Sequence, residues 1–263
     1  MDDALLWKLN LTRDRVFYVF GTMHVRDAAA FTIVDEVKDV INSCDCFYAE
    51  MNLDEAANSF SIEDYLMPFG KSLYSLLNPR KYTRISEQLY KHTGMHLSQF
   101  DRFYPMVTAN NIAEAFLSND NAMALDHYLW QWAKSQDKYM GGIETVDEQK
   151  SLLKSFDIDV QLKMFVDLAT QLSKYRSSIM SLKALYQNQD IQKLYKSSRK
   201  SMHAFRKPLL YQRNKLMADR IISLDHPSAF IAVGAAHLAG FHGILRKIKN
   251  EGVALEPIKF KHF

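Results

Sequence analysis

The sequence predicts a mixed α/β (α+β) protein whose sheet is built from two β-α-β repeats and carries a large helical insertion. Short apolar runs near both ends of the chain resemble buried strands, and amphipathic segments with helical spacing follow them. One run at each end stops at a Gly-x-x-His motif, Gly21 to His24 and Gly234 to His237. The long stretch between the two ends has mostly helical periodicity. These observations define the predicted fold class.

The first repeat lies within the first 50 residues. Residues 6–9 and 16–20 are short apolar runs on either side of a turn-like segment, and they predict a hairpin. Apolar residues recur at helical spacing over 31–43, and residues 46–49 predict another strand that ends at Glu50. Because a helix crosses between the strands before and after it, we expect those two strands to be parallel.

The middle of the chain predicts helices interrupted by one strand. An amphipathic helix is expected over 122–135, followed by a strand over 138–143 that ends at Glu144. Thr145 and Glu148 have the spacing of a capping box, which predicts that a new helix begins there.

The second repeat closes the chain. Residues 229–233 predict a strand, 243–250 a short helix and 253–258 a last strand. Because the sequence contains no low-complexity linker, we expect one domain over residues 1–263 rather than two independent domains. Its core is expected from 1–55, 136–146 and 226–263, with helical insertions over 56–135 and 147–225.

Composition restricts the function classes. The net charge of +3 is small, so the sequence indicates no nucleic-acid partner, and no apolar run is long enough to predict a membrane span. Cys44 and Cys46 are expected to be buried thiols rather than a redox or metal pair. The start of the chain lacks the features of a signal peptide. We therefore expect a cytoplasmic protein if the chain is complete, and a periplasmic or cell-envelope protein if a leader was removed.

Four ionisable residues are predicted to share one edge of the sheet. His24, Glu50, Glu144 and His237 each stand at, or one turn beyond, the carboxyl end of an expected strand. Open parallel sheets bind ligands at that edge, where loops diverge at a switch in strand order. Two imidazoles with one or two carboxylates can hold a divalent transition ion, which would lower the pKa of a bound water. A remaining carboxylate would then accept the proton of that water.

Each of these residues also has a structural interpretation. A single His after a strand is commonly a loop or core residue, but the duplicated motif favours a functional pair. Glu50 could be held by a structural salt bridge, and Glu144 could simply favour the start of the following helix. Arg213 could be a surface residue, or a fixed cation that binds a carboxylate or stabilises an oxyanion. The other histidines, His127 among them, show no metal-ligand spacing.

Several chemistries have no support in the sequence. There is no strand followed by Gly-x-Ser-x-Gly, the turn that presents an acyl-transfer serine. There is no Gly-rich phosphate-binding loop, and no His-Glu-x-x-His helix. A metallohydrolase built on this chain would therefore not use a single metal-binding helix.

The chain resembles the TraB/GumN family, which is related to the Tiki proteases. The matching segments occur in the family's order over most of the chain. They are Leu6-Trp7-Lys8, Gly21-Thr22-Met23-His24, Ala49-Glu50-Met51, Asp126-His127-Tyr128-Leu129, Gly142-Ile143-Glu144-Thr145 with Gln149, Arg213-Asn214, and Gly234 to Gly240. Gln212 is a departure, because many members have Glu there.

The resemblance implies a metal-dependent hydrolase with manganese or cobalt dependence, and His24, Glu50 and His237 as its first-rank site residues, with Glu144 and Arg213 behind them. Our hypothesis is a hydrolase that uses manganese or cobalt, or zinc, on a peptide or protein substrate. In it, His24, His237 and Glu50 bind the metal. Glu144, or Glu50 if it is not a ligand, activates water, and Arg213 orients the substrate or stabilises developing negative charge. The sequence also leaves open a non-catalytic protein of the same fold that binds or sequesters a peptide or small ligand. It does not indicate an oligomeric state.

Overall fold

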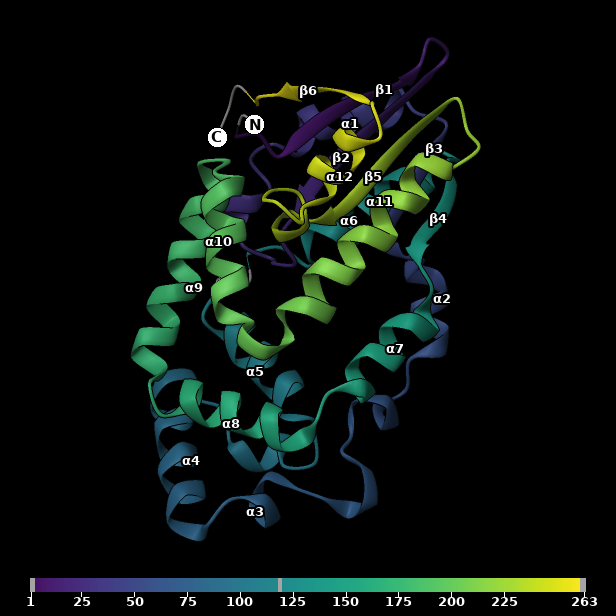
Figure 1. Cartoon of the computed structure of the whole chain (residues 1–263). Helices are drawn as coiled ribbons and strands as arrows, with labels where there is room; N and C mark the ends of the chain where they lie inside the picture. The colour runs from purple at the N-terminus through teal and green to yellow at the C-terminus, as the bar shows by residue number, and fades with distance from the viewer. Residues whose placement is uncertain (1–2, 118–119, 261–263) are drawn as a thin grey trace. The chain divides into compact units, whose positions relative to one another are not determined.

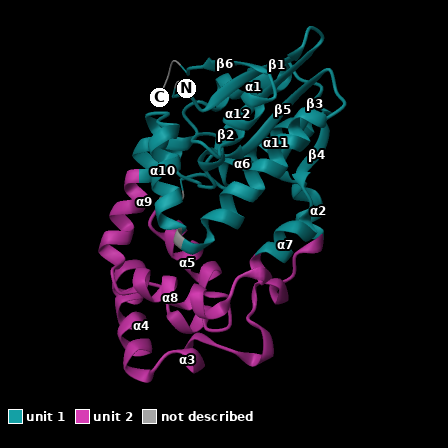
Figure 2. Cartoon of the chain, in the orientation of Figure 1, with its two compact units in different colours: residues 1–58, 119–152, 182–263 teal, residues 59–118, 153–181 magenta. Residues whose placement is uncertain are grey.

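The computed structural model describes residues 3–117 and 120–260, so the two ends of the predicted 1–263 domain lie outside the described residues. Two compact units are formed (Figure 2). The first comprises residues 1–58, 119–152 and 182–263, and the second comprises 59–118 and 153–181. All the strands of the sheet lie in the first unit, whereas the expected organisation as one domain stays a prediction.

The first unit is built on a six-stranded mixed sheet with the order β4-β3-β5-β2-β1-β6 (Figure 1). Its strands are β1 (Leu6–Thr12), β2 (Arg15–Thr22), β3 (Cys46–Met51), β4 (Tyr139–Glu144), β5 (Ser228–Gly234) and β6 (Ala254–Ile258). β1 pairs antiparallel with both β2 and β6, while β5 is parallel to both β2 and β3, and β3 is parallel to β4. The predicted α/β class is therefore confirmed.

The two predicted repeats form, but the strands of each are not adjacent. β5 lies between β2 and β3, and β2 and β1 lie between β5 and β6. The first crossover runs toward β4 and the second runs toward β6. Because crossovers of this kind are right-handed, the two connecting helices belong on opposite faces of the sheet. The helix contacts are consistent with this arrangement, because the two connecting helices have different partners. α1 (Val34–Asn42) packs with α6 (Leu125–Ser135), and α12 (Ile244–Asn250) packs with α11 (Arg213–Ser223).

This topology creates a switch point between β2 and β5. The two strands are parallel neighbours, but the chain leaves β2 for one face of the sheet and leaves β5 for the other. Loops that diverge in this way leave a crevice beyond the carboxyl ends of the strands. Both Gly-x-x-His motifs begin here.

The core between the sheet and its helices is aromatic. Phe17, Phe47, Phe230 and Trp130 are fully or almost fully buried. Phe47 stacks on Phe230 across β3 and β5, with ring centroids 5.6 Å apart, and its ring meets that of Trp130 edge-on. These contacts fix β5 between its neighbours and hold the switch point in place.

The remaining helices complete the two units. The first unit also contains α10 (Ile191–Ser201), and the second contains α3 (Leu73–Leu76), α4 (Pro79–Thr93), α5 (Pro105–Ala115) and α8 (Ile158–Ala169). α2 (Leu53–Ser59), α7 (Val146–Ser155) and α9 (Leu172–Gln187) contribute residues to both. Within the second unit, α8 packs against α4 and α5. Among the described residues, no helix is both long and apolar enough to cross a bilayer.

Both cysteines are buried and unbridged, as the sequence predicted. Burial raises the pKa of the Cys44 thiol to about 11, and burial also raises the pKa of Cys46. Thiols with such pKa values are poor nucleophiles at neutral pH. The pair is therefore part of the core rather than of a reactive site.

Candidate active site

The two Gly-x-x-His motifs lie side by side at the switch point. Thr22 at the end of β2 pairs with Gly234 at the end of β5. A Cβ on Gly21 would lie 3.0 Å from the Cα of Ala235 and 2.7 Å from Cδ1 of Leu238, so the first turn packs directly against the second. His24 stands only two residues beyond Thr22, a reach of at most about 7 Å in extended chain. The backbones of the two motifs therefore lie close together at the carboxyl ends of β2 and β5.

His24 belongs to an open cluster with Asp126 and His127. Nδ1 of His24 lies 2.7 Å from Oδ2 and 2.9 Å from Oδ1 of Asp126, and the two imidazoles meet edge-on. One potential ligand atom from each of the three residues lies within 4.8 Å of the others. The side chain of His24 is 57% exposed. We call these three residues the open cluster.

Backbone hydrogen bonds bring α6 to this position. The N–H of Leu125 donates to the carbonyl of Val25, and the N–H of Asn121 donates to the carbonyl of Arg26, each over 3.0 Å. The start of α6 is thereby attached to the loop that follows His24. Asp126 and His127, in the first turn of α6, consequently face His24.

α9 fixes the same loop from another direction. Tyr186 donates a hydrogen bond from its hydroxyl to the carbonyl of Gly21, over 3.0 Å. Nζ of Lys183 lies 2.5 Å from the buried carboxylate of Asp27, whose other oxygen accepts from the N–H of Ala29. The backbone on either side of His24 is therefore held by buried polar contacts, although the imidazole itself faces solvent.

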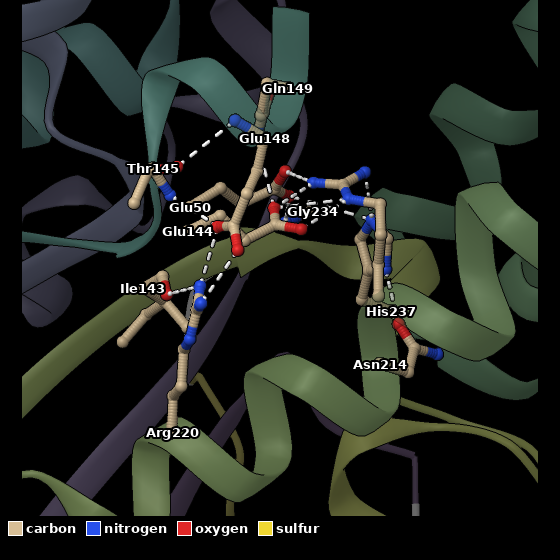
Figure 3. Close-up of polar contacts among 11 residues, drawn as sticks. Glu50, Ile143, Glu144, Thr145, Glu148, Gln149, Asn214, Arg220, Gly234 and His237 are labelled. Carbon is tan, nitrogen blue, oxygen red and sulfur yellow. Dashed lines mark hydrogen bonds and ion pairs between the residues drawn. The ribbon is translucent and has the colours of Figure 1, made fainter. Parts of the chain in front are cut away.

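Glu50, Glu144, Arg213 and His237 form a second, buried cluster. Figure 3 shows Glu50, Glu144 and His237 grouped together in it. Arg213 donates from Nε and Nη2 to both oxygens of Glu144, at 2.6–3.2 Å, and from Nη2 to Oε2 of Glu50 at 2.5 Å. The N–H of Gly234 donates to Oε1 of Glu50 over 2.7 Å, and Gln149 donates to Glu144. Nε2 of His237 lies 3.8 Å from Oε1 of Glu50. We call these four residues the buried cluster.

Local structure explains how these residues converge. Glu50 and Glu144 come from the ends of adjacent parallel strands, β3 and β4. The predicted capping box is present: the Thr145 N–H donates to Glu148, and the Glu148 N–H donates to the Thr145 hydroxyl. Arg220 then binds Glu148 with two hydrogen bonds and donates to the carbonyl of Ile143. These hydrogen bonds hold Ile143 and Thr145, and thereby fix the position of Glu144 between them.

Arg213 is presented by an unusual helix. A π-helical stretch, residues 207–212, precedes it and contains Pro208, which has no N–H for the normal helical ladder. Such stretches are frequent at functional sites. Arg213 follows at the start of α11 and points its guanidinium between two carboxylates.

The charges of the buried cluster are set by this geometry. Burial alone would raise the pKa of Glu50, but the Arg213 guanidinium and the Gly234 N–H outweigh it and hold that pKa at about 2. Burial would likewise lower the pKa of Arg213, and the carboxylates of Glu50 and Glu144 instead raise it above its ordinary value. Burial lowers the pKa of His237 to about 4, against the pull of Glu50. At neutral pH, Glu50 and Arg213 are charged and His237 is neutral.

The predicted site residues thus fall into two neighbouring groups. Glu50, Glu144, Arg213 and His237 come together, while the contacts of His24 are with Asp126 and His127. Joint ligation of one metal by His24, His237 and Glu50 stays a prediction. No pattern in the sequence assigned a role to Asp126, and His127 shows no ligand spacing, because α6 lies about a hundred residues from His24 along the chain. The one sequence signal for these two residues was that the segment Asp126 to Leu129 matches the TraB/GumN family pattern.

The fold and the site define an α/β protein with paired polar clusters at a topological switch point. The chain belongs to the TraB/PrgY/gumN family, whose sequence model matches residues 5–257.

Relatives of this chain include three proteins named as metalloproteases. Metalloprotease TIKI1 of Danio rerio is 22% identical, over 97% of this chain and 63% of its own length. A Metalloprotease TIKI homolog of Nematostella vectensis is 24% identical, over 98% and 67%, and Metalloprotease TIKI2 of Danio rerio is 24% identical, over 97% and 61%. The chain therefore spans between about three fifths and two thirds of the length of these relatives. No solved structure matches it significantly.

Proposed function

We propose that this protein is a metal-dependent hydrolase that cleaves a peptide or amide bond. The observation that carries the proposal is that His24 of an imidazole–carboxylate cluster and His237 of a buried charged cluster follow two paired strands, β2 and β5, at the switch point. The names of its metalloprotease relatives support the same reaction class. A peptide or protein is accordingly the proposed substrate.

The open cluster fits a divalent metal ion. Imidazole nitrogens and carboxylate oxygens suit zinc and other first-row ions, with bonds of about 2.0–2.2 Å. Ligand atoms bound to one ion in this way lie at most about 4.4 Å apart, so the atoms of His24, Asp126 and His127, now within 4.8 Å, need only a small movement. The exposed His24 side chain can make that movement. A bound ion would polarise a carbonyl and lower the pKa of a water at this position.

His237 and Glu50 are less suited to the same ion as long as Arg213 stays between them. Nη1 of Arg213 lies 3.4 Å from Nε2 of His237, and Nη2 lies 2.5 Å from Glu50. A permanent cation at this distance opposes a divalent ion electrostatically. We therefore propose His24, Asp126 and His127 as the principal ligands, and ligation by His237 and Glu50 as the alternative that the experiment below tests.

The buried cluster has the groups that amide hydrolysis needs. Arg213 is held by two carboxylates and can stabilise negative charge that develops on a substrate carbonyl oxygen. Glu50 is ionised at neutral pH and its side chain is 26% exposed, whereas that of Glu144 is 3% exposed and is bound by Arg213 and Gln149. Glu50 is therefore better placed to accept a proton from water, and Glu144 to orient Arg213.

The test is a titration of Mn²⁺, Co²⁺ and Zn²⁺ into metal-stripped protein, followed by calorimetry and thermal unfolding. We expect binding by the unsubstituted protein, a loss of at least about tenfold in affinity in His24→Ala and His127→Ala, and no change in His96→Ala, an exposed histidine of the second unit. An equal loss in His237→Ala would support the alternative ligand set. If no ion binds, the metallohydrolase proposal is wrong.

Turnover is then measured on a peptide library with the ion that binds most tightly. Cleavage that disappears in Arg213→Lys and Glu50→Gln, with metal affinity retained, supports the assigned roles. Peptide binding without cleavage in any loaded form would instead identify a binding protein.

A further inference from the structure

Asn214 is the neighbour of Arg213 in the chain and is completely buried. Oδ1 of Asn214 lies 2.5 Å from Nδ1 of His237, and Nδ2 of Asn214 donates to the carbonyl of His242 over 2.8 Å. Figure 3 shows Asn214 and His237 facing each other at the edge of the buried cluster. No sequence pattern singled out Asn214 for a role of its own, so its function has to be argued from these contacts.

The contacts determine which way the amide points. An Asn side chain donates only from its nitrogen and accepts only at its oxygen. A carbonyl oxygen accepts only, so the partner of His242 has to be Nδ2 of Asn214. Oδ1 is thereby turned toward His237, and the ring nitrogen that faces it, Nδ1, has to carry the proton.

Arg213 favours the same tautomer from the opposite side of the ring, over a longer distance. Its guanidinium can only donate, and Nη1 lies 3.4 Å from Nε2 of His237. A proton on Nε2 would place two donors against each other. The neutral imidazole therefore carries its proton on Nδ1 and has a lone pair on Nε2, directed at the polar groups of the buried cluster.

We propose that Asn214 is a positioning residue that holds His237 in the Nδ1–H tautomer, so that Nε2 is presented to the site as a lone pair. The inference rests on the proposed function only in what Nε2 then does, which is to bind a metal ion or accept a proton. Without Asn214, the opposite tautomer would gain a partner, because Oε1 of Glu50 lies 3.8 Å from Nε2 and could accept a proton placed there. Loss of Asn214 is therefore expected to favour the tautomer in which Nε2 carries the proton and the lone pair is on Nδ1, which faces away from the site.

The experiment reads the tautomer itself by NMR on protein labelled with ¹⁵N-histidine, without metal or substrate. Long-range ¹H–¹⁵N spectra distinguish a protonated Nδ1 from a protonated Nε2, and His237→Gln assigns the signals. We expect Nδ1–H in the unsubstituted protein and a clearly larger fraction of Nε2–H in Asn214→Leu, where only the longer Arg213 contact still favours Nδ1–H. Asn214→Asp loses the donor to the His242 carbonyl but keeps an acceptor at Nδ1, so Nδ1 should stay protonated. Under the proposed function, kcat should fall about 10–100-fold in Asn214→Leu, with partial recovery in Asn214→Asp, while metal affinity falls only if His237 is a ligand.

Gln161 provides a matched control in the second unit. It is 1% exposed, accepts from the Met106 N–H and donates to the Phe156 carbonyl. Like Asn214, it is therefore a buried amide whose oxygen and nitrogen each have a hydrogen-bond partner. Gln161→Leu should lose stability like Asn214→Leu but leave the His237 tautomer unchanged.

An Nε2–H tautomer in the unsubstituted protein would overturn the inference even if Asn214→Leu fails to fold. So would an unchanged Nδ1–H tautomer in a folded Asn214→Leu. If the tautomer responds as expected while the unsubstituted protein neither binds metal nor cleaves peptides, the positioning role stands and the proposed function is wrong.

Discussion

The open cluster includes His24, which follows β2, and the buried cluster includes His237, which follows the neighbouring strand β5, yet the two clusters differ in how their charges are exposed to water. His24 projects into solvent beside Asp126, whereas Arg213 is enclosed by Glu50, Glu144 and His237. Water screens the first group and allows its ligands to exchange. The second group is removed from water, and its charges persist because each one has a partner. The open cluster is therefore suited to taking up an ion, and the buried cluster to holding fixed groups in position.

Removal of Arg213 should have the largest effect on stability. Arg213→Met leaves two carboxylates beside each other in a buried site, and we expect the free energy of unfolding to fall by about 3–5 kcal/mol. All three tryptophans, Trp7, Trp130 and Trp132, belong to the first unit, so urea unfolding followed by tryptophan fluorescence reports on the unit that contains the site. Lys215→Met, which removes an exposed pair with Asp219, should have a much smaller effect on the free energy of unfolding. Equal losses in the two variants would contradict a buried charged cluster.

The same contrast predicts how stability depends on pH. The pKa of His237 is about 4 in the folded protein and 6.5 ordinarily, so between these values the unfolded chain binds more protons than the folded one. The contribution of His237 to the free energy of unfolding is therefore fully present above about pH 6.5. It decreases as the pH drops toward 4, by at most about 3 kcal/mol. The low pKa of Glu50 adds a further loss as the pH falls from about 4.5 toward 2.

Urea unfolding at intervals between pH 7 and pH 4 checks this dependence. In His237→Gln the slope over that range should decrease, whereas His96→Gln, on the exposed surface, should retain it. A slope that is unchanged in His237→Gln would mean that another group is responsible.

Gly21 tests the packing of the two motifs against each other. In Gly21→Ala the new Cβ would lie 3.0 Å from backbone at Ala235, and we expect a loss of about 1–3 kcal/mol in the free energy of unfolding. Gly234→Ala is the comparison variant, because its Cβ would meet side-chain atoms of Glu50 at 3.1 Å and His237 at 3.4 Å rather than backbone. It should unfold at higher urea concentration than Gly21→Ala. The reverse order would show that the turns are not closely packed.

Much of the fold could be predicted from the sequence because its signals are local. Apolar runs that end at Gly21, Glu50, Glu144 and Gly234 marked strand ends, and Thr145 with Glu148 marked the start of a helix. The convergence of two Gly-x-x-His motifs followed from one assumption, that their strands are neighbours, and β2 and β5 are indeed paired.

The composition of the site was less predictable, since it depends on contacts between distant segments. Asp126 and His127 meet His24 only because backbone groups of α6 bind the loop after β2. Asn214 lies within a helix, where periodicity indicates burial but not a hydrogen bond to His237. The role of Arg213 as the partner of both carboxylates also required the order of β3 and β4 in the sheet.

His24→Ala should have the smallest effect on stability, although it removes a proposed metal ligand. The His24 side chain is 57% exposed, and an exposed contact with a carboxylate contributes about 0–1 kcal/mol even when both groups are charged, so the free energy of unfolding of metal-free protein should change by less than about 1 kcal/mol. Asp27→Ala, three residues further along the same loop, should cost more, because it removes a buried carboxylate that binds Lys183 and the Ala29 N–H. With metal added, the order should change: Asp27→Ala should still gain stability from the ion, and His24→Ala should gain little. If His24→Ala destabilised the metal-free protein as much as Asp27→Ala, His24 would be a structural residue. That result would contradict the distinction between an open cluster that exchanges ligands and a buried cluster that holds charges in place.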